Sequence, residues 1–79
     1  MLSKVKDYII DNEFRVTLFE NRFLAVNFIK ILSLEEERVS FSTSYGRVVI
    51  KGENFSLQRL LDREVLVVGV VLGVEVSYE

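Results

Sequence analysis

The end of this sequence alternates between two kinds of side chain over a long stretch. At every second position from Leu66 to Tyr78 the residue is apolar. Successive side chains of a β-strand point to opposite faces, so this spacing places them on one face, whereas the period of a helix would scatter them around its axis. The pattern predicts a strand with one continuous apolar face, made by Leu66, Val68, Val70, Leu72, Val74, Val76 and Tyr78.

The opposite face of the same segment changes character along its length. It begins apolar, at Val65, and is polar from Glu75 onward, and the change falls in the part that contains Gly69 and Gly73. Strands usually have about 3 to 10 residues, and a glycine inside a strand often marks a bulge or a bend. We therefore expect one long final strand that bends near Gly69 or Gly73.

Similar patterns predict strands in the rest of the chain. Residues 14–18 and 38–43 alternate between apolar and polar side chains. Residues 23–32 are mostly apolar and would also suit one face of a helix, but their β-branched and aromatic residues favour a strand. Breaks between strands are expected at the polar segments 20–22, 33–37 and 62–64.

A hairpin is expected to follow residues 38–43. Tyr45 and Gly46 offer a two-residue turn, because glycine tolerates the positive φ that tight hairpin turns require. A second turn is expected at 52–54, and 55–61 would then form a short strand or a helical turn. The register of the first hairpin would place Thr43 opposite Val48, Phe41 opposite Ile50 and Val39 opposite Gly52.

These elements predict an all-β fold. No proline, repeat or linker-like stretch divides the chain, so we expect a single domain over residues 1–79. The expected architecture is a small antiparallel rolled sheet or barrel-like sheet of about six to eight short strands, with the long bent strand last. The first residues leave two interpretations open, because Leu2, Val5 and Ile9, with Ser3 as a cap, suit a short helix as well as a strand.

The residue types present exclude most enzymatic designs. The chain has no histidine and no cysteine, so it lacks a side chain that titrates near neutral pH, a thiolate nucleophile and the usual ligands of zinc. Ser40, Ser42 and Ser44 have no histidine to activate them, and the carboxylates at 35–37 would not converge in a strand. We therefore expect no enzyme, cofactor, metal site or small-molecule substrate.

The length of the chain makes its stability depend on further contacts. A domain of 79 residues buries only about 60 to 65% of the surface that its unfolded chain exposes, and this one has neither a disulfide nor a zinc site. Self-association is the device that remains, so we expect a homo-oligomer. The lack of cysteine fits a reducing compartment and the first residues lack the pattern of a signal peptide, so the cytoplasm is the expected location.

The charge of the chain argues against nucleic acid without excluding it. Ten basic and twelve acidic residues give a net charge of -2, so no overall field attracts a polyanion. Six arginines are spread along the chain and could converge in the fold, but Phe14 and Phe41, which could stack on bases, fall on the predicted core face. A small nucleic-acid-binding barrel is therefore the alternative function.

The sequence also contains more apolar positions than one core face needs. Several valines lie on the parity opposite to the predicted core, and an exposed cluster of this type usually marks a contact with another protein. The alternative is that a curled sheet or the N-terminal segment covers them. The candidate protein-contact face consists of Val49, Val65, Val67 and Val71.

Four segments of the chain resemble the YabP/YqfC family, and the YqfC branch is the more similar. The resemblance is carried by strand and glycine spacing over most of the chain from residue 14 onward. No reactive residue anchors it. The segments are 38–41 (RVSF), 46–57 (GRVVIKGENFSL), 64–69 (EVLVVG) and 74–78 (VEVSY).

This resemblance implies a small protein of endospore-forming bacteria that is made in the mother cell and takes part in sporulation. It implies no catalytic activity and transfers no functional residue. It supports structural roles for Gly46, Gly52 and Gly69 as turn and bend positions. Together with the surplus valines, it suggests an interaction protein that docks onto a protein partner, with a membrane protein of the sporulation programme as one such partner.

Overall fold

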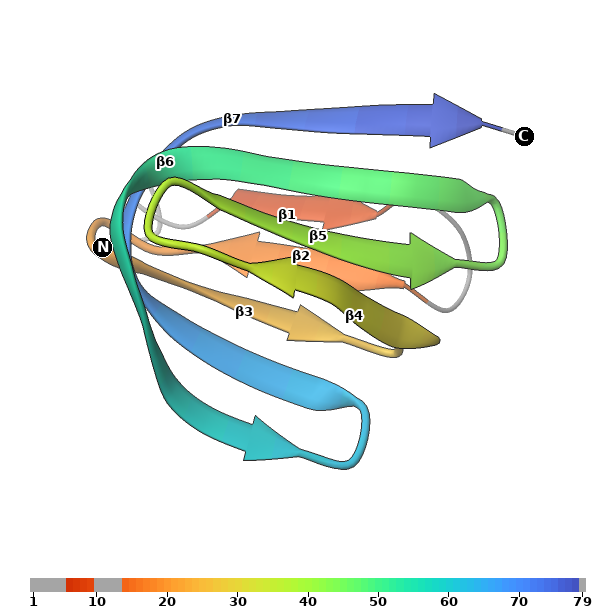
Figure 1. The fold of residues 1–79 in the computed structure, drawn as a ribbon, viewed down its shortest axis with the longest axis horizontal. Helices are drawn as coiled ribbons and strands as arrows, with labels where there is room; N and C mark the ends of the chain where they lie inside the picture. The colour runs from red at the N-terminus through yellow and green to blue at the C-terminus, as the bar shows by residue number, and fades with distance from the viewer. Residues whose placement is uncertain (1–5, 10–13, 79) are drawn as a thin grey trace.

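The structure is a computed structural model that describes residues 6–9 and 14–78. Within these residues every regular element is a β-strand, and the strands form one antiparallel sheet in the order β1-β2-β3-β7-β6-β5-β4 (Figure 1). The prediction of an all-β fold is therefore confirmed. The strands are β1 (Lys6–Ile9), β2 (Arg15–Leu18), β3 (Arg22–Val26), β4 (Lys30–Leu34), β5 (Arg38–Thr43), β6 (Gly46–Leu61) and β7 (Glu64–Tyr78).

The sheet is rolled because its two longest strands take part in two layers. β6 and β7 pair with each other along nearly their whole lengths. However, β5 pairs only with residues 46–51 of β6, and β3 pairs only with residues 64–68 of β7. The β6–β7 hairpin thus bends from a layer that contains β4 and β5 into a layer that contains β1, β2 and β3, as Figure 1 shows.

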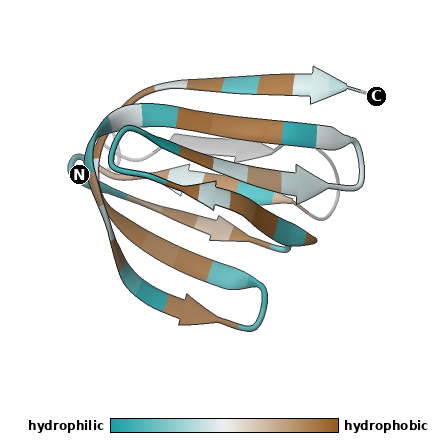
Figure 2. Ribbon diagram, in the orientation of Figure 1, coloured by the Kyte–Doolittle hydropathy of each residue, from teal (hydrophilic) through white to brown (hydrophobic). Residues whose placement is uncertain are grey.

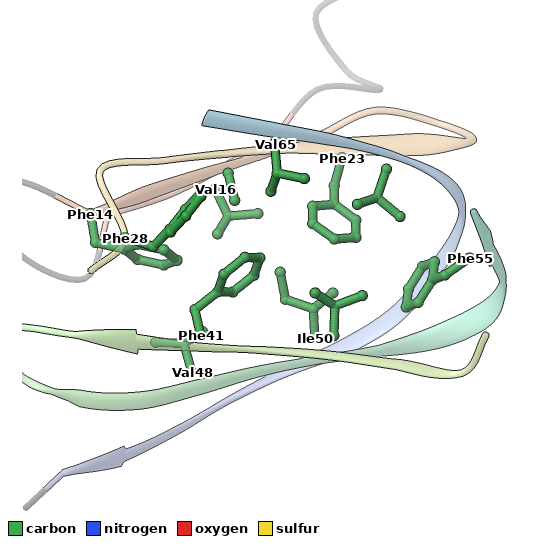
Figure 3. Packing of buried hydrophobic residues seen from close by; sticks show 12 residues of the cluster. Phe14, Val16, Phe23, Phe28, Phe41, Val48, Ile50, Phe55 and Val65 are labelled. Carbon is green, nitrogen blue, oxygen red and sulfur yellow. The ribbon is translucent and has the colours of Figure 1, made fainter. Parts of the chain in front are cut away.

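The hydrophobic core lies between the two layers (Figure 3). Phenylalanine rings join its two sides: the ring centroids of Phe14 and Phe41 are 5.8 Å apart, and those of Phe28 and Phe41 are 5.2 Å apart. Such tilted ring pairs are favourable beyond the area that they bury. The buried core residues are Phe14, Val16, Phe23, Ala25, Phe28, Val39, Phe41, Val48, Ile50, Phe55, Val65 and Val67.

The bend of the hairpin is built around Phe55. Its ring packs edge-on against Phe23, with centroids 5.4 Å apart and planes at 78°. The ring occupies the space beside two glycines, because a Cβ added to either Gly52 or Gly69 would overlap it. Gly69 also has a φ of 145°, a backbone conformation that only glycine adopts readily. Both strands can therefore curve closely around a buried aromatic ring.

Backbone hydrogen bonds tie the bend to both layers. The Gly69 N–H donates to the Asn21 carbonyl oxygen (2.8 Å), in the turn between β2 and β3. The Phe55 N–H donates to the Glu36 carbonyl oxygen (2.8 Å), in the turn between β4 and β5. Since a buried N–H without a partner is costly, these bonds fix where each short hairpin meets the long one.

β7 carries one extra residue at the bend. Lys51 lies opposite Gly73 and Gly52 lies opposite Val71, so Leu72 has no counterpart on β6 and forms a bulge. Because side chains alternate with a period of two, one inserted residue exchanges the two faces of the strand.

Because of this bulge, the buried face of β7 before Leu72 is the one opposite to the predicted core face. Before it, Val65 and Val67 are fully buried and Val68 between them and the bend is exposed. After it, Val74 and Val76 pack against the core. The final strand is long and bent, as predicted, but the prediction of one apolar core face along its whole length is wrong.

Two turns differ from the predictions. Residues 23–32 form β3 and β4 rather than one strand, and the chain turns between them at Asn27, which has a φ of 65°. The turn predicted at 52–54 lies inside β6, where Asn54 (φ 59°) and a register shift absorb the bend, and the strand continues through 55–61. Asparagine tolerates this left-handed conformation, which a pattern of hydrophobicity does not record.

The β5–β6 hairpin differs by two residues in register. Its turn consists of Ser44 and Tyr45, so Phe41 lies opposite Val48 rather than opposite Ile50. A shift of two residues leaves each side chain on its original face. The predicted apolar face is accordingly buried at Phe41, Val48 and Ile50.

The N-terminal segment is described only in part. Residues 6–9 form β1, which pairs with β2, so the helical alternative is wrong for these residues. The positions proposed for the cap and first turn of that helix, Leu2, Ser3 and Val5, lie outside the described residues.

The bend predicts a large difference between two glycine substitutions on the same strand. In Gly69→Ala the new methyl group would meet the Phe55 ring and the Glu53 carbonyl oxygen at a positive φ. We expect it to lower the free energy of unfolding by at least about 2 kcal/mol. Urea denaturation followed by circular dichroism measures this change.

Gly73→Ala is the matched control for this prediction. A Cβ at Gly73 meets no atom within 4 Å, so we expect a change in the free energy of unfolding within about 1 kcal/mol. Equal effects of the two substitutions would show that the close packing around Phe55 does not hold the bend.

Candidate protein-contact surface

The part of the long hairpin beyond the bend carries much of the exposed apolar surface. We call residues 56–61 of β6 and 64–70 of β7 the distal hairpin. Its β7 side pairs with β3, whereas its β6 side has no strand beside it among the described residues. Figure 2 shows apolar colouring along both strands of this hairpin. Its exposed large apolar residues are Leu57, Leu60, Leu61, Val68 and Val70, and exposed Leu72 follows at the bulge.

The inner side of the distal hairpin continues the core outward. Leu57 lies opposite Val67 and Leu60 lies opposite Val65, so both leucines share the face of buried valines. The leucines are nevertheless 43% and 54% exposed. They lie on the edge strand of their layer, and in Figure 1 the distal hairpin extends past β4, the edge strand of the other layer. The core is therefore open to solvent along this edge.

The outer side of the distal hairpin is apolar as well. Leu66 lies between Leu24 of β3 and Arg59 of β6, and exposed Val68 lies between Arg22 and Ser56. Apolar side chains thus form the middle of this face and polar ones flank it. Strands with apolar residues on both faces are typical of sheets that are covered on both sides. On this outer side Val68 is 37% exposed and Leu66 is half-buried.

The predicted contact face is not assembled as the sequence suggested. Val65 and Val67 are fully buried, so their predicted exposure is wrong, and the alternative that the curled sheet covers them is correct. Val71 is half-buried against the core, and half-buried Val49 lies on the outside of the other layer. The four valines therefore do not form one surface.

Only some of the exposed residues correspond to a pattern in the sequence, and that pattern predicts the wrong side for them; Leu57, Leu60 and Leu61 belong to no predicted site. Val68, Val70 and Leu72 belong to the alternating set that was expected to form the core. The surplus of apolar positions in 65–72 is real, and it indicates two apolar faces. The pattern does not say which face is buried, because both parities of this segment are apolar.

A second surface, on the outside of the other layer, is polar. A shallow groove of about 440 Å³ lies over β4, β5, β6 and β7. It contains three cationic side chains and one carboxylate, with serine hydroxyls between them, and the Ser33 and Ser40 hydroxyl oxygens are 2.6 Å apart. Its lining residues are Leu32, Ser33, Arg38, Ser40, Arg47, Val49, Lys51, Glu75 and Ser77.

Most of the charge in this groove is paired. The Lys51 Nζ donates to Glu75 Oε2 (2.8 Å), and an Arg38 guanidinium nitrogen lies 3.6 Å from Glu35 Oε1. Arg47 makes no ion pair within the described part of the chain. Of the six arginines that could converge in the fold, Arg38 and Arg47 line this groove, beside Lys51.

The described residues contain no group of three or more side chains suited to holding a metal ion, and no helix that could span a membrane. No protein-family model, curated protein or solved structure matches the chain. Membership of the YabP/YqfC family therefore stays a prediction from the four segments quoted above.

The inverted burial of β7 predicts losses of stability that differ in size for two neighbouring valines. Val67→Ala removes buried methyl groups from the core, so we expect the free energy of unfolding to fall by about 2 kcal/mol. Val68→Ala removes groups that are 37% exposed on the outer side, so we expect a loss below about 1 kcal/mol. Urea midpoints of the two variants compare them directly, and a larger loss for Val68→Ala would contradict the observed register.

Proposed function

We propose that this protein is a non-enzymatic interaction module that docks onto a protein partner through the distal hairpin. The observation that carries the proposal is that this hairpin has apolar side chains on both faces. Only its inner face packs against the core, and it does so only in part. Exposed apolar surface rimmed by polar residues is a mark of protein contacts. Arg22, Arg59 and Glu53 supply such a rim.

The resemblance to the YabP/YqfC family supports a place for this docking. It suggests endospore formation, in the cytoplasm of the mother cell, and a membrane protein of the sporulation programme as the first partner class to test. The residue types support the absence of catalysis, because the chain has no histidine and no cysteine. These supports are independent of the geometry of the hairpin.

The docking surface is tested by polar substitution at its tip. Leu60→Asn and Leu61→Asn change side chains that are 54% and 53% exposed, so the fold is expected to persist. In crosslinking and affinity purification from the native host, we expect each variant to recover at least about tenfold less of the partner than the unaltered chain does, because buried apolar anchors dominate interface energies.

Leu32→Asn is the matched control for docking. Leu32 is 46% exposed but belongs to β4 and lines the polar groove, whose lining includes no residue of the distal hairpin. It should leave partner recovery unchanged. Equal recovery with all variants would overturn docking through the distal hairpin, and a host that forms no endospores would overturn the sporulation assignment alone.

A second candidate function is nucleic-acid binding in the polar groove. The convergence of Arg38, Arg47 and Lys51 favours it, whereas the paired carboxylates and the burial of Phe14 and Phe41 in the core count against it. If all three cations contact phosphates of a single strand, affinity should fall about 20-fold between about 50 mM and 200 mM salt. Fluorescence anisotropy with single-stranded DNA and RNA measures this, and no binding at low salt would exclude the function.

A further inference from the structure

The final part of β7 forms one of the free edges of the sheet. Strand β3 pairs with β7 only as far as Val68, so within the described residues β7 has a neighbour on one side only beyond that point. An edge strand presents unpaired N–H and C=O groups along its length, and the structure that satisfies such a row of groups is another strand. Residues 73–78 pair with β6 in regular register, so this edge is straight over that stretch.

This edge lacks the features that usually prevent edge pairing. The strand β4 has a bulge between Ile31 and Ser33 and begins with Lys30. The free edge of β6 is interrupted by two register shifts and by charged residues, including Arg59. By contrast, residues 73–78 contain neither proline nor lysine, and their one charge, at Glu75, is paired with Lys51 of the same chain.

The exposed side chains of this edge also match a second copy of themselves. Val74, Val76 and Tyr78 share the side of the strand that faces the core, since Val74 and Val76 lie opposite the buried Ile50 and Val48. Val74 and Val76 are only half-buried, and Tyr78 is 71% exposed. A strand added along this edge with the same pattern would extend the core over them.

We propose that residues 74–78 of β7 pair antiparallel with the same residues of a second copy of this chain. The twofold axis passes beside Val76, which places Val74 of each copy opposite Tyr78 of the other and Glu75 opposite Ser77. This register joins the apolar side chains and keeps the two Glu75 carboxylates from lying opposite each other, which a register centred on Glu75 would not. The layer of β4, β5, β6 and β7 becomes continuous across the dimer, and the interface uses the same residues of both copies, as closed twofold symmetry requires.

The dimer is tested by measuring the average molar mass of the full chain in solution across a dilution series from about 1 mM to about 1 µM. We expect the unaltered chain to dimerise reversibly. Ser77→Glu places a carboxylate opposite Glu75 of the second copy twice in each dimer. We therefore expect the dissociation constant of the dimer to rise at least about tenfold. Ser77 lies opposite Arg47 within its own chain, so this substitution keeps the monomer folded.

Two controls separate the edge from other surfaces. Ser77→Gln adds bulk without charge and should leave the dimer intact. Leu60→Asn lies on the distal hairpin and should also leave it intact. A chain that stays monomeric throughout the series would overturn the proposal, as would a dimer that is unaffected by Ser77→Glu or that is dissociated by Leu60→Asn.

The register is tested by introducing one cysteine into a chain that has none. Residues directly opposite each other in neighbouring antiparallel strands have Cβ atoms close enough for a disulfide. Val76→Cys lies on the twofold axis and should crosslink two copies under mild oxidation. Val74→Cys is on the same side of the same strand but faces Tyr78 of the second copy, so it should crosslink at least about tenfold more slowly. Equal rates for the two variants would overturn the register.

Discussion

The close contact of the Phe55 ring with Gly52 and Gly69 is the constraint on which the rest of the structure depends. It lets two long strands curve together around a buried side chain, and N–H groups at the same point donate backbone hydrogen bonds to carbonyl oxygens in the turns at Asn21 and Glu36. Without this curvature, β6 and β7 would form a flat ribbon that could bury only one face. With it, one hairpin supplies strands to both layers, and the two layers enclose a core.

The same bend determines which surfaces are left for partners. A rolled sheet that does not close keeps free edges, and the layers end at different places along β6 and β7. Beyond the reach of β4, the distal hairpin keeps apolar side chains on both faces, while the outside of the other layer is polar and partly cationic. The chain therefore offers three distinct surfaces: an apolar hairpin, a straight strand edge and a polar groove.

The strands at 14–18 and 38–43 could be predicted because alternation with a period of two has few other structural solutions. The turn at Asn27 and the continuation of a strand through 52–54 could not, because a single asparagine can adopt a left-handed conformation in a turn, as Asn27 does, or inside a strand, as Asn54 does. The candidate site shows the same division. A surplus of apolar residues near the end of the chain was correctly recognised, yet Val65 and Val67 were assigned to the outside and Val68 to the inside.

The sequence by itself determined that the chain is all-β, and it excluded catalysis by histidine or cysteine because those residues are absent. The tertiary structure alone decided which side of each strand is buried. A period of two is identical for both faces, so the phase is set only when the bulge at Leu72, the ring of Phe55 and the register between β6 and β7 are fixed together. That phase is what places Val65 and Val67 in the core and Val68 between them and the bend at the surface.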